Sequence, residues 1–187
     1  MVSVWARLVD SRARRFCVVR LLPLVFEGYA VVDIETTGLD AESDEMVGFG
    51  LAYDRYLLGC VRMYGSDGEM RGLARDVVLS LLRDGVPVYA WNKRFEEAWL
   101  GVEGLSELQL RPYEKKDTAL RLGIDLYADG RMVPRLWERW MKYRDAEALL
   151  KILWRGMYDA YVEAVSLYRR SLRLLDPLNN DVVLIAV

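Results

Sequence analysis

Two acidic residues interrupt a run of β-branched residues near the start of this chain. In the stretch "VVDIETTGLD", Asp33 and Glu35 are flanked by valine and isoleucine, residues that are typical of a buried strand. An ionised carboxylate in such a strand is unstable unless it is paired or bound to a metal. Because the two acids are two residues apart, a strand projects both from one face. Such a pair suits a hard cation such as Mg²⁺ or Mn²⁺, although an edge strand with solvated acids is the alternative.

Composition limits the remaining possibilities. With 187 residues, of which 53% are hydrophobic and 29% charged, the chain is expected to be a single globular domain. The net charge is −2, and no apolar run has the length of a membrane span. Cys17 and Cys60 are expected to be reduced thiols, and a cytoplasmic location is predicted. The chain has no histidine, which excludes imidazole chemistry, and its few amides and many arginines are typical of a thermophile.

The hydrophobic pattern predicts an α/β fold with one mixed sheet flanked by helices. Residues 1–28 form an N-terminal extension, for which a hairpin within 15–26 is one interpretation, and residues 176–187 form an apolar C-terminal tail. Between them, strands are expected at 29–35, 46–54, 57–63 and 86–91, with a tight turn at 54–56. Helices are expected at 69–83, 93–100, 117–123, 133–142 and 145–175.

Four segments, in order along the chain, resemble motifs of one family. "VVDIETTGL" resembles the first motif of the DEDD 3′–5′ exonuclease superfamily, and "WNKRFEEAWL" (91–100) resembles the second. "KDTAL" (116–120) resembles an Asp-Thr segment that often follows. The stretch that begins at "VPRLWERW" resembles the C-terminal part of an uncharacterised RNase H-like nuclease group. The resemblance implies an RNase H-like domain over residues 29–175, with a mixed central sheet flanked by helices.

The resemblance also implies a site for two Mg²⁺ or Mn²⁺ ions. Its catalytic and metal-binding residues would be Asp33, Glu35, Glu96 and Asp159. Glu96 stands where the family has aspartate, and the alternative is an ordinary acid at a helix start, where the helix dipole favours it. For the third motif, Glu163 and Glu147 are the alternatives to Asp159, which is itself a surface acid in the simpler interpretation.

Several further residues are expected to lie around this site. In the third motif, Arg155 stands where the family has histidine or tyrosine, and Gly156 stands where it often has asparagine. Tyr158 is therefore the candidate general base, unless the metal activates the water without one. Asp117 is interpreted as a helix N-cap or as a residue behind the ligands. The candidate nucleic-acid-binding residues are Thr36, Thr37, Asn92 and Phe95.

The predicted function is that of a metal-dependent nuclease that hydrolyses phosphodiester bonds. A 3′–5′ exonuclease acting on single-stranded DNA or RNA ends is favoured, and an endonuclease on the same fold fits the same residues. The alternative class is a catalytically degraded relative that binds nucleic acid or a protein partner. That alternative is favoured by the changes at Glu96, Arg155 and Gly156. A protein partner could bind through the N-terminal extension or the C-terminal tail.

Overall fold

One mixed sheet carries helices on both of its faces. The computed structural model describes residues 6–8, 14–124 and 130–175. Its strands are β1 (Ala6–Leu8), β2 (Arg15–Thr36), β3 (Met46–Arg62), β4 (Val88–Ala90) and β5 (Ser106–Glu107). Its helices are α1 (Asp67–Arg83), α2 (Lys93–Leu100), α3 (Pro112–Arg121), the 3₁₀ turn η1 (Gly130–Met132), α4 (Val133–Tyr143) and α5 (Ala146–Leu175).

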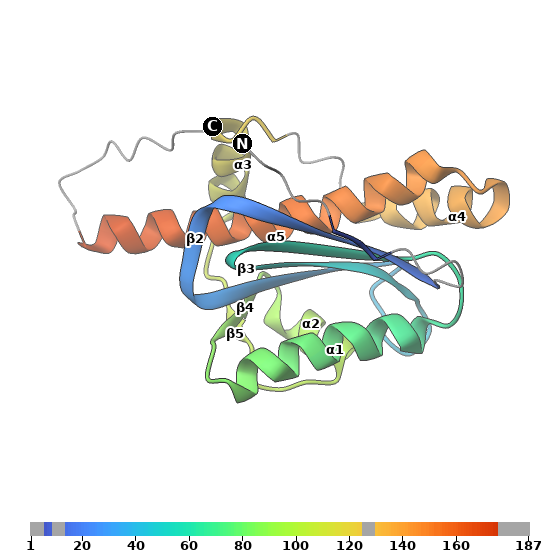
Figure 1. The fold of residues 1–187 in the computed structure, drawn as a ribbon, viewed down its shortest axis with the longest axis horizontal. Helices are drawn as coiled ribbons and strands as arrows, with labels where there is room; N and C mark the ends of the chain where they lie inside the picture. Colours follow the sequence, from blue (N-terminus) through green and yellow to red (C-terminus); the bar gives the residue numbers. More distant parts are fainter. Residues whose placement is uncertain (1–5, 9–13, 125–129, 176–187) are drawn as a thin grey trace.

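The sheet is built around two long strands that turn back on themselves. Both arms of β2 pair with β3 antiparallel, and the register shifts between Leu21 and Ala30 and again between Glu35 and Thr36. Figure 1 shows both strands reversing direction at the same end, with β3 nested inside β2. A Cβ built on Gly48 would lie 2.8 Å from the backbone oxygen of Cys60, so the two arms of β3 lie side by side. β1 pairs antiparallel with the first arm of β2, whereas β4 and β5 continue the sheet in parallel from the second arm.

The predicted strands and turns are confirmed in part. The turn expected at 54–56 falls within β3, where Asp54 has a φ of 51°. The interpretation of 15–26 as a separate hairpin is wrong, because Arg15 to Leu21 pair instead with Tyr56 to Arg62 of β3. β2 therefore runs across the boundary expected between residues 28 and 29. The C-terminal tail, residues 176–187, lies outside the described residues.

The predicted helices are confirmed with one shift. α1, α2, α4 and α5 match their expected ranges within about two residues. α3, however, begins at Pro112 rather than 117, and the Glu114 carboxylate accepts a hydrogen bond from the Arg111 backbone N–H at 2.7 Å. Proline in the first turn and this carboxylate are the signals that mark the true start. Asp117 is consequently a mid-helix residue, and the N-cap interpretation is wrong.

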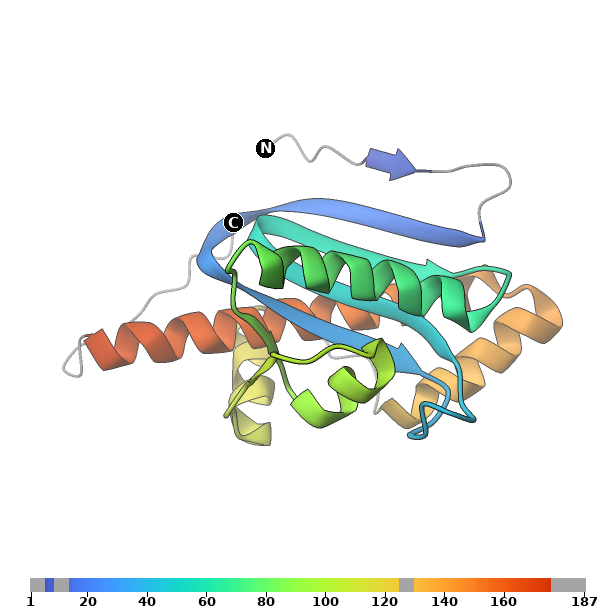
Figure 2. The ribbon, with the colours of Figure 1, turned by 90° about the horizontal axis from the view of Figure 1, so that it is seen from below.

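The helices divide between the two faces of the sheet. Figure 1 shows α3, α4 and α5 above the sheet and α1 and α2 below it, and Figure 2 shows α1 crossing the lower face. Each face has its own core cluster. Trp137, Ile152 and Met157 belong to the upper one, and Met70 and Trp99 belong to the lower one. No helix in the described part of the chain is long and apolar enough to span a membrane.

Two glycines allow α5 to approach the sheet closely. Gly50 of β3 lies opposite Asp33 of β2, and a Cβ on Gly50 would lie 2.0 Å from the backbone oxygen of Gly156 in α5. A Cβ on Gly156 would lie 3.3 Å from the Gly50 nitrogen and 3.4 Å from Glu35 Cγ. The helix backbone therefore rests on the strand backbone beside the two acids. Gly156 therefore allows the close packing of α5 on β3.

A disulfide joins the two cysteines, which corrects the expectation of reduced thiols. Cys17 of β2 and Cys60 of β3 are directly opposed in the antiparallel register, with Cα atoms 4.1 Å apart. That separation is slightly shorter than the range of about 4.4–6.8 Å that is usual for a disulfide. The two cysteines are 43 residues apart in the sequence, so no local pattern indicates their pairing. Only the register between β2 and β3 brings them together.

We expect Gly50→Ala to destabilise the protein by roughly 2–3 kcal/mol, since the new methyl group would force α5 away from β3. Gly72→Ala, in α1, is the matched control: a Cβ there meets nothing within 4 Å, and alanine is the better helix former, so stability should rise by up to about 1 kcal/mol. Urea denaturation monitored by circular dichroism measures both. Equal stability of Gly50→Ala and wild type would contradict the close contact.

We also expect reduction of the disulfide to lower the melting temperature. Cross-linking residues 43 apart restricts the unfolded chain, which corresponds to roughly 4 kcal/mol in the chain-entropy model. Thermal denaturation with and without a phosphine reductant measures the effect, and the Cys17→Ser/Cys60→Ser variant should not respond to the reductant. Two reactive thiols in the unreduced, unfolded wild type would show that the bond does not form.

Candidate metal centre

Five carboxylates from three elements converge beside the Gly50–Gly156 contact. Asp33 and Glu35 lie on the second arm of β2, opposite Gly50 and Gly48 of β3. Without side chains, these glycines leave space for the acids on the face that α5 covers. On α5, the residues at 155, 159 and 163 follow the four-residue spacing that places side chains on one helix face. Glu96 enters from the first turn of α2 and is 3% exposed.

Three of the predicted ligands lie within reach of a single ion. Asp33, Glu35 and Asp159 each offer one carboxylate oxygen, and these oxygens lie within 4.8 Å of one another. Asp159 is 2% exposed, so its interpretation as a surface acid is wrong. Glu96 is buried but does not belong to this group of three. The charges of Glu163 and Lys115 affect the pKa of Glu96, so Glu96 lies near these two residues.

The alternatives for the third motif are resolved by position. Glu163 is fully buried and interacts with the same basic side chain as Asp159, so both acids belong to the cluster. Glu147 is exposed at the start of α5, where it pairs with Lys151 at 2.7 Å. Glu147 therefore takes no part in the cluster.

Two basic side chains hold the carboxylates in place. Arg155 contacts Glu35 Oε2 through Nε at 3.0 Å and Asp159 Oδ2 through a terminal nitrogen at 2.9 Å. Lys115 of α3 places Nζ 3.1 Å from Asp159 Oδ1 and 2.6 Å from Glu163 Oε1. Lys115 was missed in the sequence, although it directly precedes "KDTAL". Nothing in the local pattern marks it, since its partners lie more than 40 residues away on α5.

The carboxylates outnumber these cations. If all five acids were ionised, two basic side chains would leave three negative charges uncompensated in a buried place. In the described structure, Asp33 Oδ2, Glu35 Oε1, Glu96 Oε2 and Glu163 Oε2 are buried without a hydrogen-bond partner. An unpartnered buried carboxylate oxygen is costly, and a proton or a metal ion relieves that cost.

The pKa values of the acids respond to this crowding. Burial raises the pKa of Glu35 and Glu96 to about 8 and that of Glu163 to about 7. Burial also raises the pKa of Asp33 well above its ordinary value, and the neighbouring charges of Asp159 and Glu35 raise it further. Burial alone would lower the pKa of Lys115, but the carboxylates around it outweigh burial and raise the pKa. Without a metal, the cluster therefore retains protons near neutral pH.

A divalent cation fits this arrangement in its chemistry. Carboxylate oxygens are the ligands that Mg²⁺ and Mn²⁺ prefer. Two of the unpartnered oxygens belong to Asp33 and Glu35, which are members of the group within 4.8 Å. The residues present can therefore hold one ion at Asp33, Glu35 and Asp159.

The other predicted site residues have structural contacts of their own. The Thr36 hydroxyl donates to the Gly38 oxygen at 2.6 Å, and the Thr37 hydroxyl accepts from the Glu45 backbone at 2.8 Å. Asn92 caps α2 by accepting from the Phe95 backbone N–H at 3.4 Å. These three side chains thus shape the two chain segments that border the acids.

The predicted aromatic residues pack within the fold. Phe95 lies against Trp99 with ring centroids 5.9 Å apart. Tyr158, the candidate base, stacks on Trp154 one turn earlier in α5, at 5.7 Å. Trp91 lies below the Lys115 ammonium, 5.2 Å from Nζ to the ring centroid. Asp117 is partly exposed and pairs with Arg121 at 3.0 Å and Arg169 at 3.3 Å.

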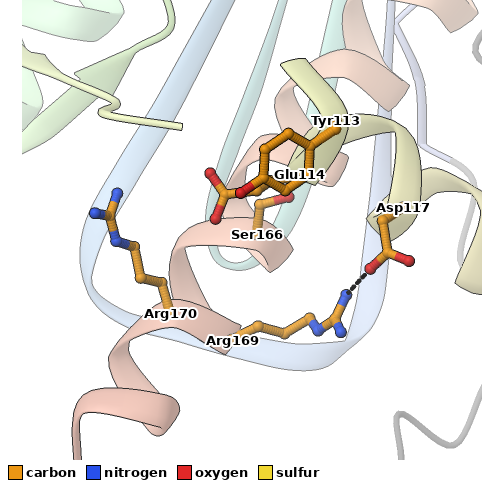
Figure 3. A pocket seen from close by; sticks show the side chains of 6 residues that line it. All are labelled: Tyr113, Glu114, Asp117, Ser166, Arg169 and Arg170. Atoms are coloured by element: carbon orange, nitrogen blue, oxygen red, sulfur yellow. Dashed lines mark hydrogen bonds and ion pairs between the residues drawn. The ribbon is translucent and has the colours of Figure 1, made fainter. Parts of the chain in front are cut away.

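A cavity of about 440 Å³ lies between α3 and α5, the two helices that supply Lys115, Asp159 and Glu163. It is lined by Tyr113, Glu114, Asp117, Ser166, Arg169 and Arg170. Figure 3 shows the Arg169 guanidinium directed at the Asp117 carboxylate. Arg170 donates to the backbone oxygen of Gln109. The cavity begins about one helical turn beyond Glu163 along α5 and combines two guanidinium groups with two acids.

Comparison with known proteins adds no assignment: no protein-family model matches this chain, and no curated protein matches it with significant similarity.

In a metal-free solution, we expect stability to fall as the pH rises from 5 to 8. Glu35, Glu96 and Glu163 have folded-state pKa values of about 7 to 8, above their ordinary value of 4.5, so the folded state binds protons more tightly than the unfolded state. The stabilisation is complete below the unfolded pKa and is lost as the pH passes the folded pKa. Melting temperatures in a chelator across this range measure it.

Glu96→Gln tests whether Glu96 contributes to this pH dependence of stability. A neutral amide replaces the protonated acid without changing its size, so the fall in melting temperature between pH 5 and 8 should become shallower. Glu147→Gln, at an exposed acid, should leave the profile unchanged. A wild-type melting temperature that rises over this range would contradict the described burial of the cluster.

Proposed function

We propose that this chain is a metal-dependent nuclease with an RNase H-like fold. The observation that carries the proposal is the convergence of Asp33, Glu35 and Asp159, whose ligand oxygens lie within 4.8 Å. They are three of the four acids that the resemblance to DEDD exonucleases assigns to the metal; the fourth, Glu96, lies outside the group. Two elements, β2 and α5, must fold together to form that group, across a sequence separation of up to 126 residues.

The order of the elements also supports the proposal. An antiparallel block formed by β2 and β3 is followed by the parallel strands β4 and β5, with helices on both faces. The first motif lies on a strand in the middle of this sheet. The second motif lies at the start of a helix that follows a strand, with Asn92 as its cap. These are the positions that the resemblance implies for an RNase H-like domain.

The proposed reaction is hydrolysis of a phosphodiester bond at a single-stranded end. A divalent cation bound here would lower the pKa of a water and polarise a phosphate. Asp33, Glu35 and Asp159 would hold it, and Arg155 orients Glu35 and Asp159 by contacting both. Glu96 and Glu163 carry raised pKa values of about 8 and about 7, which place them near the range where a carboxyl group can exchange a proton at neutral pH.

The cavity between α3 and α5 supports a nucleic-acid substrate. Guanidinium groups bind phosphate with two parallel hydrogen bonds. Of the two that line this cavity, Arg169 is buried and paired with Asp117, so the exposed Arg170 is the one that could contact a phosphate. From Glu163 to Arg170 the helix advances about 10 Å, so the cavity lies beside the acid cluster. A strand whose last phosphate lies at the cluster could extend along α5 toward Arg170.

The second candidate is a binding module that retains the fold without the reaction. One observation favours it: both carboxylate oxygens of Asp159 already contact built-in cations, Lys115 and Arg155. If those two side chains replace the metal entirely, the site is a structural ion-pair network. The nuclease is preferred because Asp33 and Glu35 still present unpartnered buried oxygens.

We expect wild-type protein with Mn²⁺ to shorten single strands labelled at the 5′ end, and Asp33→Asn to reduce this rate by a factor of about 10² or more. The substitution is nearly isosteric but removes one of the charges that hold the cation. Its melting temperature should stay within a few degrees of wild type, because one of several mutually repelling acids is also removed. Gel electrophoresis of DNA and RNA strands measures the rate.

Two matched variants complete the experiment. Glu147→Gln removes an exposed acid on α5 and should leave the rate unchanged, whereas Glu96→Asp introduces the family residue and should preserve or raise it. Cleavage of a circular strand would indicate an endonuclease instead. If wild type and Glu96→Asp are both inert on every strand, yet the folded protein binds one, the binding module is correct.

A further inference from the structure

Lys115 is a cation held inside the acid cluster by the fold. Its side chain is 18% exposed, and Nζ lies 2.6 Å from Glu163 Oε1 and 3.1 Å from Asp159 Oδ1. The Trp91 ring lies on its other side, 5.2 Å from Nζ. Two carboxylates and an aromatic face together make a favourable place for an ammonium group. Its neighbour Lys116 is exposed, so the two adjacent lysines have different environments.

The carboxylates fall into two groups according to the cation they contact. Asp33, Glu35 and Asp159 form the group within 4.8 Å, and Arg155 bridges two of them from one side. Glu163 and the other oxygen of Asp159 contact Lys115. The unpartnered oxygens of Asp33 and Glu35 belong to the first group, where they can complete the shell of one ion.

A second divalent ion would have to compete with Lys115. Mg²⁺ binds oxygen at about 2.0–2.1 Å, and Mn²⁺ takes the same carboxylate ligands. An ion that bridges Asp159 Oδ1 to Glu163 Oε1 would therefore need the two oxygens that the ammonium contacts at 3.1 and 2.6 Å. The ammonium and the ion cannot occupy that place together. Moving Lys115 away would also remove a salt bridge from Glu163, which is fully buried.

We infer that this site binds one divalent cation, at Asp33, Glu35 and Asp159, and that the Lys115 ammonium occupies the place of a second. The inference rests on the proposed function, because it concerns the same metal centre. It revises the expectation of two ions, which came from the resemblance alone.

The charge balance agrees with a single ion. Three carboxylates in the first group are neutralised by one divalent cation together with Arg155. In the second group, Lys115 pairs with Glu163 at 2.6 Å. A second divalent ion there would add positive charge to a carboxylate that the ammonium already neutralises.

Counting the bound ions tests the inference without depending on activity. Metal-free full-length protein is titrated with Mn²⁺ at pH 7.5 by isothermal titration calorimetry, and the dialysed complex is analysed for manganese. We expect one ion per chain for wild type. Lys115→Ala removes the ammonium and opens space at Asp159 and Glu163, so we expect two ions per chain. Lys116→Ala, the matched control on the same helix, should keep one.

Each result distinguishes the inference from the proposed function. Two ions in wild type would overturn the inference while leaving a metal-dependent nuclease intact, and so would one ion in a folded Lys115→Ala variant. No binding in wild type would overturn both. If Lys115→Ala does not fold, Glu163→Gln serves instead: a single ion in both this variant and wild type supports the inference, whereas a fall from two ions to one contradicts it.

Discussion

The contact between the backbones of Gly50 and Gly156 is the constraint on which the site depends. A methyl group on Gly50 would lie 2.0 Å from the Gly156 oxygen, so no other residue type fits the strand at this distance from the helix. One turn after Gly156, Asp159 faces the β2 strand at the level of Asp33. If α5 stood farther from the sheet, by the width of an alanine side chain, the carboxylate oxygens of β2 and α5 would be too far apart to share an ion.

The close packing of α5 on the sheet buries several carboxylates, and the neighbouring cations neutralise only some of their charges. α5 covers the acids of β2 and removes them from water, while contributing two further carboxylates of its own. Arg155 and Lys115 neutralise two of the charges, one from α5 itself and one from α3. Burial raises the pKa values of Glu35 and Glu96 to about 8, and the neighbouring acids add to this rise. A site in this condition binds either protons or cations, which links metal affinity to pH.

The motif residues that differ from the family are explained by their surroundings. Gly156 follows from the packing of α5 against β3. Arg155 supplies the positive charge that orients Glu35 and Asp159, a role that histidine could fill only when protonated. Glu96 begins α2, and its longer side chain is buried near Glu163 rather than within the group of three ligands. The differences at positions 155 and 156 therefore belong to one local arrangement of helix and sheet.

The features that the sequence predicts correctly are those set by interactions between residues close together in the chain. The β-branched run around Asp33 predicted a buried strand, and the spacing of Asp33 and Glu35 predicted one shared face. Periodic apolar residues likewise predicted α1, α4 and α5, because these patterns act within a few residues. α3 begins five residues before its expected start, although Pro112 and Glu114 mark that start locally.

The amino-acid sequence by itself determined the α/β character of this protein, the position of most helices, and the shared strand face of Asp33 and Glu35. Only the tertiary structure decided which of Asp159, Glu163 and Glu147 are buried, that Lys115 joins them, and that Cys17 faces Cys60. The physical reason is distance along the chain. Helix and strand periodicity is a local property, whereas burial, ion pairing and strand register depend on residues that are 40 to more than 100 positions apart.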